Sequence, residues 1–388
     1  MRLKDYRQMK GLVSYYTKNH EEILGWIKEQ FICQSSDLPL FSSIDVRNSG
    51  HKVAHVDFNL FPSGFNNIDE SAHALSATAC RQYLEAYYPD IKEILVYPEQ
   101  FSRNEFYLSS LKALLKIIAD AGFSHKVIVH DDIFDEMQLE NKIRPSDIAE
   151  TKQSLILLNN DLTNGVPDFL ANYDGTILPS PDLGWHARRK SRHFLKFDEI
   201  LIKVAEHFNF DPWLLSTYNE MCESVDFRER KNLECIARKV NEVLAKVTEK
   251  YKEYGIDNDP YVFIKSDQGT FGLGIMTAKS GEEILQINKK KRHSMQRIKL
   301  GIENTRVMIQ EGIPSIEKTA DGHTAEEMVY STFARPSCIF NRIHGDVDEY
   351  ASLNTSGMSF GNCRELPRSD LRYMINKIAN IATIYEKY

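Results

Sequence analysis

A lysine followed closely by three glycines is the first feature of this sequence that could do chemistry. Lys265 ends the apolar run VFIK, and Gly269, Gly272 and Gly274 follow it in a short segment. Backbone N–H groups can approach phosphate oxygens closely where no Cβ intervenes, and a lysine adds a positive point charge. The pattern therefore predicts a loop that binds nucleotide phosphates, although a plain hairpin would have a similar composition. The segment GTFGLG matches neither the P-loop pattern nor GxGxxG, which sets those two motifs aside.

Polar residues farther along the chain could complete a nucleotide site. The segment VMIQEG predicts a strand that ends in a hinge at Gln310, and the backbone groups after it could pair with the edge of adenine. Glu311 or Glu317 could accept a hydrogen bond from a ribose hydroxyl, or both could be ordinary acids at a strand end. Arg342 could neutralise a transferring γ-phosphate, and Asn354 could ligate the Mg²⁺ that bridges the phosphates.

Four polar side chains at the end of a predicted strand could bind a small polar substrate. They are Asp57, Asn59, Asn66 and Asn67, in the strand KVAHVDFNLF and the turn PSGFNN after it. Loops of an α/β sheet are the usual place for ligands, and these mixed donors and acceptors suit an amino acid. Asparagine also closes turns without any ligand, so the residue types leave both interpretations open.

Basic segments could contact anionic groups. Arg103 and Asn104 precede a predicted helix, where a substrate carboxylate would be favoured, although Asn104 could simply cap that helix. The run WHARRKSRHF (185–194) places aromatic residues around a cluster of positive charges, and NKKKRHSMQRIK (288–299) is also strongly basic. Solvated surfaces would explain both runs. A lid over a nucleotide is the functional alternative for the second run.

Composition describes a globular chain without special targeting features. It has 388 residues, of which 42% are hydrophobic, and a net charge of -7. The length suffices for two or three domains, and the negative charge argues against a general nucleic-acid binder. No stretch is apolar enough for a membrane helix and the N-terminus is too polar for a signal peptide, so we expect a cytoplasmic protein. The six cysteines form no CxxC pair, which favours reduced thiols over a disulfide framework or a structural metal site.

The elements that must position these residues follow a simple order. Strand and helix patterns alternate over residues 52–161, which is typical of an α/β fold with a mostly parallel sheet. The segment 178–196 is rich in proline, glycine and basic residues, and it predicts a domain boundary. We therefore expect an N-terminal α/β substrate-binding domain at 1–180 and a second region at 181–388. Long helical patterns begin that second region, and short strands end it.

Several of these segments, taken together, resemble one enzyme family. Their order along the chain is VDFNLFPSGFNN, RRKSRHF, KSDQGTFGLGIM, VMIQEGI and LNTSGM. This combination resembles the proteobacterial ATP-grasp type of glutamate-cysteine ligase. The resemblance implies an ATP-grasp fold for 181–388, with ATP and Mg²⁺ as cofactors. It also implies small-molecule partners only, with neither nucleic acid nor a membrane, and it leaves a homo-oligomer open.

The reaction implied by the resemblance is the first step of glutathione biosynthesis. ATP would phosphorylate the γ-carboxylate of glutamate, and the amine of cysteine would then attack the acyl phosphate. Lys265 and Arg342 would be the catalytic residues, and Lys190 would be a second lysine on the ATP phosphates. Two alternatives remain: the same chemistry on another pair of amino acids, and a non-catalytic nucleotide-binding protein of the same fold.

The implied metal site departs from the family pattern at one position. Such enzymes commonly carry an acid or amide two residues before the metal-binding asparagine, and here Ser352 stands before Asn354. Serine is a poorer Mg²⁺ ligand than a carboxylate. Glu326 or Glu327 could supply the missing charge from a neighbouring strand. If neither does, the non-catalytic alternative would be favoured.

Overall fold

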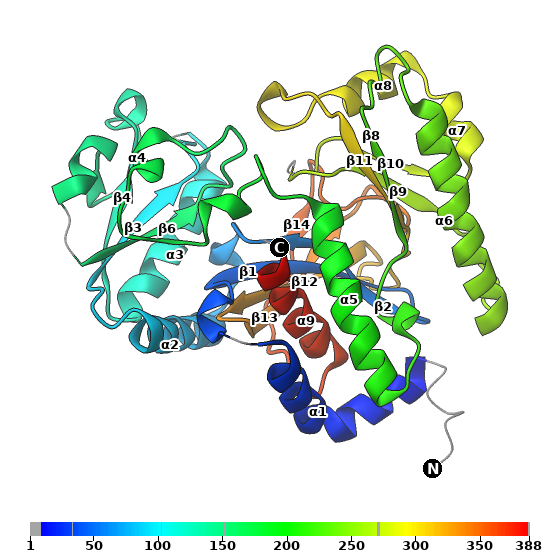
Figure 1. Cartoon of the computed structure of the whole chain (residues 1–388), viewed down its shortest axis with the longest axis horizontal. Coiled ribbons are helices and arrows are strands. Elements are labelled where there is room, and N and C mark those ends of the chain that lie inside the picture. The colour runs from blue at the N-terminus through cyan, green and yellow to red at the C-terminus, as the bar shows by residue number, and fades with distance from the viewer. Residues whose placement is uncertain (1–8, 33, 102, 151–152, 270–271, 387–388) are drawn as a thin grey trace.

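Three sheets and the helices that cover them make up the part of the chain that the structure describes (Figure 1). This computed structural model describes residues 9–32, 34–101, 103–150, 153–269 and 272–386. None of the helices in these ranges combines the length and the apolar character needed to cross a membrane. The α/β class predicted from the sequence is confirmed.

One sheet is entirely parallel, as the alternating patterns predicted. Its strand order is β5-β4-β3-β6-β7. The apolar runs EILVYP and SLILLN form its central strands and are almost wholly buried, as expected for strands with helices on both faces. The strands are β3 (Glu93–Pro98), β4 (Ser124–Ile128), β5 (Lys142–Ile143), β6 (Ser154–Asn159) and β7 (Thr176–Leu178). The helices of this part of the chain are α2 (Glu70–Tyr87), α3 (Glu105–Asp120) and α4 (Asp168–Ala171).

A second, antiparallel sheet combines strands from the N-terminal and the C-terminal parts of the chain. Its strand order is β14-β13-β12-β1-β2. The strands are β1 (Phe41–Asn48), β2 (Val53–Asn59), β12 (Thr324–Thr332), β13 (Arg335–His344) and β14 (Ser359–Phe360). Three helices pack on one another, and two of them, α5 and α9, also pack on this sheet. These helices are α1 (Met9–Phe31), α5 (Lys190–Phe208) and α9 (Leu371–Tyr385).

The domain boundary predicted at residue 180 agrees only in part with the sheets of the structure. The parallel sheet does end near that boundary, because β7 ends at Leu178. However, β1 and β2 precede the boundary and belong to the second sheet, since β1 pairs with β12 from Phe41↔Thr332 to Val46↔Glu327. The parallel-sheet domain is therefore inserted between β2 and the remainder of the second sheet.

The third sheet is antiparallel and carries the glycine-rich segment. Its strand order is β10-β9-β11-β8. The strands are β8 (Asn219–Glu223), β9 (Val262–Ser266), β10 (Ile275–Ala278) and β11 (Arg306–Glu311). The helices nearby in the chain are α6 (Leu233–Tyr254), α7 (Gly281–Leu285) and α8 (Lys289–Gln296), and α6 packs on the sheet through β8, β9 and β11.

A disulfide corrects the expectation of reduced thiols. Cys222 of β8 and Cys235 of α6 are bonded, and their Cα atoms are 6.3 Å apart. The absence of a CxxC pair did not exclude this bond, because a strand and the helix packed on it bring distant cysteines together. Cys80, Cys338 and Cys363 are free.

Candidate active site

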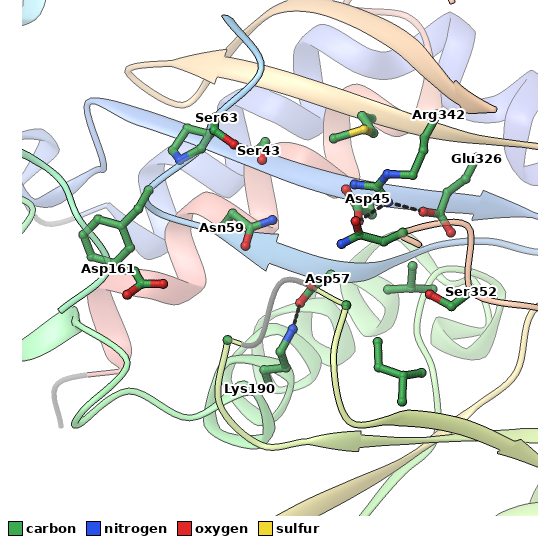
Figure 2. Close-up of a pocket in the computed structure, with 18 of the residues that line it drawn as sticks. Ser43, Asp45, Asp57, Asn59, Ser63, Asp161, Lys190, Glu326, Arg342 and Ser352 are labelled. Carbon is green, nitrogen blue, oxygen red and sulfur yellow. Dashed lines mark hydrogen bonds and ion pairs between the residues drawn. The ribbon is translucent and has the colours of Figure 1, made fainter. Parts of the chain in front are cut away.

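Residues from all three sheets line one cavity, and many of them are charged. The cavity lies between one face of β1 and β2, the β9–β10 hairpin and the carboxyl ends of β3 and β6, and Figure 2 shows part of its lining. Its charged lining residues are Asp45, Arg47, Asp57, Glu99, Asp161, Lys190, Lys265, Glu326 and Arg342. A buried space with both signs of charge is suited to a polar, multiply charged ligand.

Lys265 and Lys190 both line this cavity, and both lie near Asp57. Lys265 is 8% exposed, and its Nζ donates to the carbonyl oxygen of Val56, 3.0 Å away. Lys190 begins α5 and forms an ion pair with Asp57, which Figure 2 shows as a dashed line. Burial lowers the pKa of Lys265 to about 8; Asp57 opposes this shift and the positive charge of Lys190 adds to it. Burial would raise the pKa of Asp57, but the two lysines outweigh it and hold that pKa below its ordinary value.

The glycine-rich segment is the loop of an antiparallel hairpin that closes over the cavity. Lys265 of β9 pairs with Ile275 of β10, and Gly269 and Gly272 both line the cavity. A Cβ at Gly272 would collide with the carbonyl oxygen of Asn354, and its φ of +81° lies in the left-handed region. Glycine is thus required for the loop to approach Asn354 so closely. Residues 270 and 271 lie outside the described residues.

Arg342 is held between two carboxylates on the opposite side of the cavity (Figure 2). Its Nη1 donates to Asp45 Oδ2 at 2.8 Å and to Glu326 Oε1 at 2.6 Å. The second oxygen of Glu326 accepts from Arg47 Nε at 2.6 Å. Burial would raise the pKa of Glu326, but Arg47 and Arg342 together hold it below its ordinary value. Burial raises the pKa of Asp45, and its ion pair with Arg342 opposes this shift.

Glu326 and Glu327, two of the predicted metal ligands, face opposite sides of β12. Glu326 lines the cavity together with Ser352 and Asn354. Glu327, the next residue, is outside the cavity lining, and its carboxylate binds Arg364 and Arg372. Adjacent residues of a strand face opposite sides of the sheet, so only one of the two glutamates could reach the cavity.

Oxygen donors for a divalent metal are nevertheless present. In the described ranges, no group of three or more His, Cys, Asp or Glu side chains is arranged to hold a metal ion. Asp45 Oδ1, however, is buried without a hydrogen-bond partner among the described residues. Together with Glu326 and the amide of Asn354, it offers the hard oxygen ligands that Mg²⁺ takes beside phosphate oxygens. These residues fit the metal that the family pattern implies.

Only part of the predicted substrate set reaches the cavity. Asp57 and Asn59 line it. Asn67 donates to the carbonyl oxygen of Gly64 at 3.1 Å, and neither it nor Asn66 lines the cavity. These two residues close a turn, which was the alternative that the sequence left open.

The predicted carboxylate site at the start of α3 is also outside the cavity. Arg103 has an 86% exposed side chain and pairs with Glu136. Asn104 accepts from the Tyr107 N–H at 3.1 Å and thereby caps α3. Helix capping, the simpler of the two interpretations, accounts for Asn104.

The predicted adenine hinge is occupied by contacts within the protein. Gln310 donates to Thr217 at 3.1 Å, and Glu311 accepts from Lys52 at 2.8 Å. The N–H groups of Glu311 and Gly312 already donate to the carbonyl oxygens of the residues that precede β8 and β9. Glu317 accepts from Asn48 at 2.9 Å. None of these residues lines the cavity, so the placement does not bring the predicted adenine and ribose contacts to the site.

The basic run 185–194 extends into α5, and its side chains Arg188, Lys190 and His193 are buried. Arg188 makes two hydrogen bonds to the carboxylate of Glu386, at 2.7 and 2.9 Å. His193 contacts the same carboxylate at 2.7 Å. Arg188 and His193 hold the pKa of Glu386 at about 2, although burial opposes them. These buried groups are not part of a solvated surface, whereas Arg192 of the same run is exposed.

Several lining residues were missed in the sequence. Ser43, Asp45 and Arg47 occupy alternate positions of β1 and all line the cavity. Alternation of polar residues with Ile44 and Val46 is visible in FSSIDVRN and could have indicated them. Other missed residues lie after strands of the parallel sheet, namely Glu99 and Asp161.

The two antiparallel sheets enclose lysines and arginines beside carboxylates, an arrangement that suits polar, anionic ligands. The chain belongs to the glutamate-cysteine ligase family (GshA), whose model matches residues 14–374. It is thus an enzyme that joins glutamate to cysteine in glutathione biosynthesis. Ligases of this family are ATP-dependent.

A solved structure agrees with this assignment. A crystal structure of a candidate gamma-glutamylcysteine synthetase from Methylobacillus flagellatus KT aligns with a TM-score of 0.85 and 30% identity, covering 100% of this chain and 97% of that one. A glutathione synthetase-like effector from Globodera pallida aligns with a TM-score of 0.36 and 7% identity over 86% of this chain and 82% of that one, which is too distant to support any argument. No curated protein matches the sequence.

Proposed function

We propose that the cavity between the three sheets is where glutamate is phosphorylated and then joined to cysteine. The observation that carries this proposal is the convergence of Lys190, Lys265 and Arg342 with Asp45 and Glu326 in one buried space. Transfer of a phosphoryl group to a carboxylate brings two anions together, so it needs fixed positive charge and little else from the protein. Because such a reaction consumes ATP, a cytoplasmic location is part of the proposal.

The residues would act through charge and position. Lys265 and Lys190 offset the negative charge of the ATP phosphates, and Arg342 stabilises the transferring phosphoryl group. The γ-carboxylate oxygen of glutamate forms the new bond to phosphorus as the bond to ADP breaks. The amine of cysteine then attacks the γ-carbonyl carbon, and phosphate leaves. Asp57 and Asn59, beside Lys190, are placed to orient the amino-acid substrate.

Mg²⁺ would be held by Asp45, Glu326 and Asn354, and when bound it supplies further positive charge against the phosphates. In this arrangement Glu326 supplies the carboxylate ligand that Ser352 lacks. The non-catalytic alternative, which rested on that serine, is therefore not favoured.

The substrates are tested by measuring ADP release from the purified protein with ATP and Mg²⁺. We expect release only when glutamate and cysteine are both present, with γ-glutamylcysteine as the product. Equal or faster release with another pair of amino acids would overturn the assignment of substrates.

The Mg²⁺ requirement should rise when Asn354 is replaced by alanine. The variant loses one oxygen ligand, so we expect the Mg²⁺ concentration for half-maximal activity to increase about tenfold, on the scale of 10- to 100-fold losses seen for metal-site partners. Asn341→Ala is the matched control, since Asn341 lies on β13 outside the cavity lining. An unchanged Mg²⁺ dependence in Asn354→Ala would place the metal elsewhere.

Nucleotide affinity should fall as the pH rises through about 8. The pKa of Lys265 is lowered from 10.5 to about 8 in the free protein, so the side chain is protonated below that pH and neutral above it. The neutral form does not attract phosphate. We expect the dissociation constant of a non-hydrolysable ATP analogue to rise above pH 8 in the wild type and to stay flat in Lys265→Arg, whose guanidinium remains charged. Identical profiles for the two proteins would contradict the role of Lys265.

A further inference from the structure

Glu99 and Asp161 form a pair of carboxylates at the end of the cavity nearest the parallel sheet. Glu99 directly follows β3, and Asp161 comes shortly after β6, the strand beside it. Both line the cavity, and both are buried. The backbone N–H of Asp161 donates to Glu99 Oε1 at 3.2 Å, which holds the Glu99 carboxylate beside residue 161. Carboxyl ends of neighbouring parallel strands are a usual position for groups that bind ligands.

One lysine faces these two carboxylates from the third-sheet side of the molecule. Lys299, shortly after α8, places its Nζ 2.7 Å from Glu99 Oε1 and 2.8 Å from Asp161 Oδ2. All three side chains are at most 10% exposed. Lys299 carries a single positive charge against two negative ones, so the group retains an excess of negative charge on the cavity wall. Burial and the neighbouring Asp161 raise the pKa of Glu99, in agreement with that excess.

The cavity is therefore polarised along its length. Figure 2 shows Asp161 on one side, Asn59 and the Lys190–Asp57 pair in the middle, and Arg342 with Glu326 on the other side. The far side and the middle carry four lysine and arginine side chains against three carboxylates, whereas the Glu99–Asp161 side carries one lysine against two carboxylates and so suits a cation. A molecule with a carboxylate at one end and an ammonium group at the other would be oriented by these two regions.

We propose that Glu99 and Asp161 bind the α-ammonium group of the glutamate substrate. This inference rests on the proposed function of the cavity. A pair of carboxylates stabilises a protonated amine, so it suits the amine that must remain unreactive. The amine of cysteine must lose its proton to attack, and it is excluded from this subsite on that ground. Anchoring the α-ammonium here directs the other end of glutamate, its γ-carboxylate, toward Lys265 and Arg342.

The test compares glutamate with glutarate, which has the same carboxylate chain but no amino group. Wild-type protein should prefer glutamate, as measured by the ratio of the two kcat/KM values with ATP and cysteine saturating. In Glu99→Gln and in Asp161→Asn, we expect that ratio to fall about 10- to 100-fold, the scale of one lost charged hydrogen bond. Glu93→Gln is the matched control, because Glu93 begins β3, the strand that Glu99 follows, and pairs with a lysine, Lys126, outside the cavity.

Binding without turnover provides a second readout. Calorimetric titration of each folded variant should show weaker binding of glutamate and unchanged binding of glutarate, and thermal unfolding identifies any variant that does not fold. If the carboxylates and Lys299 serve only to hold the sheets together, both ligands should be affected equally and the preference should be unchanged. That result in both variants would overturn the subsite.

Failure of the subsite and failure of the proposed function give different results. An unchanged preference in Glu99→Gln and Asp161→Asn, together with lost turnover in a variant of Arg342, overturns the subsite alone. A reduced preference together with full turnover in the Arg342 variant supports the subsite and overturns the assignment of phosphoryl transfer.

Discussion

Replacing Arg342 by lysine should lower kcat about 10³-fold, the lower end of the range for an arginine that stabilises a transferring phosphoryl group. Lysine keeps the charge between Asp45 and Glu326, so the protein should remain folded. Arg342 holds both carboxylates through Nη1 alone, so lysine can replace those contacts, but it lacks the remaining planar N–H groups that would contact a phosphoryl group. Steady-state ADP release gives kcat, and thermal unfolding gives stability.

The control for this variant is on the same strand. Arg335→Lys changes the same residue type at the start of β13, outside the cavity lining, where Arg335 contacts Gln82. Its kcat should match the wild type. A kcat for Arg342→Lys within threefold of the control would remove Arg342 from the catalytic set.

Replacing Lys265 by methionine should lower kcat/KM for ATP about 10²- to 10³-fold, as expected when one preorganised charge is removed from a developing anion. Methionine has nearly the same length, and Lys265 is buried with its pKa already lowered, so folding should be little affected. The measurement is kcat/KM for ATP at saturating glutamate and cysteine, at pH 7, where the wild-type lysine is protonated.

Lys279→Met is the control, because it removes one positive charge from the same hairpin but outside the cavity. Lys279 immediately follows β10 in the same hairpin, is exposed and does not line the cavity. Normal kinetics in both variants would show that the glycine-rich loop is an ordinary hairpin, the alternative that its composition allowed.

Local patterns were enough to predict the elements and some of the site. Lys265 and Arg342 were expected from residue type and order, and they do line one cavity. The two adjacent glutamates at 326 and 327 show what alternation along a strand adds, because only Glu326 faces the cavity. Applying the same alternation to β1 would also have indicated Asp45.

Contacts between distant segments could not be predicted in this way. The pairing of β1 with β12 joins residues almost 300 positions apart, and no local pattern encodes such a register. The same is true of Lys299, which reaches Glu99 from 200 positions away. The adenine hinge at Gln310 stays a prediction, and the hydrogen bonds that its neighbours' N–H groups make within the protein are again contacts between distant segments.

The central claim is that the γ-carboxylate of glutamate is activated by phosphorylation, and oxygen transfer tests it most directly. Glutamate labelled with ¹⁸O in its γ-carboxylate is incubated with the enzyme, ATP, Mg²⁺ and cysteine, and the released phosphate is analysed by mass spectrometry. The account predicts one ¹⁸O atom in each phosphate, because the oxygen that attacks phosphorus leaves with it when the amide forms. Phosphate without the label, released as γ-glutamylcysteine accumulates, would contradict the account.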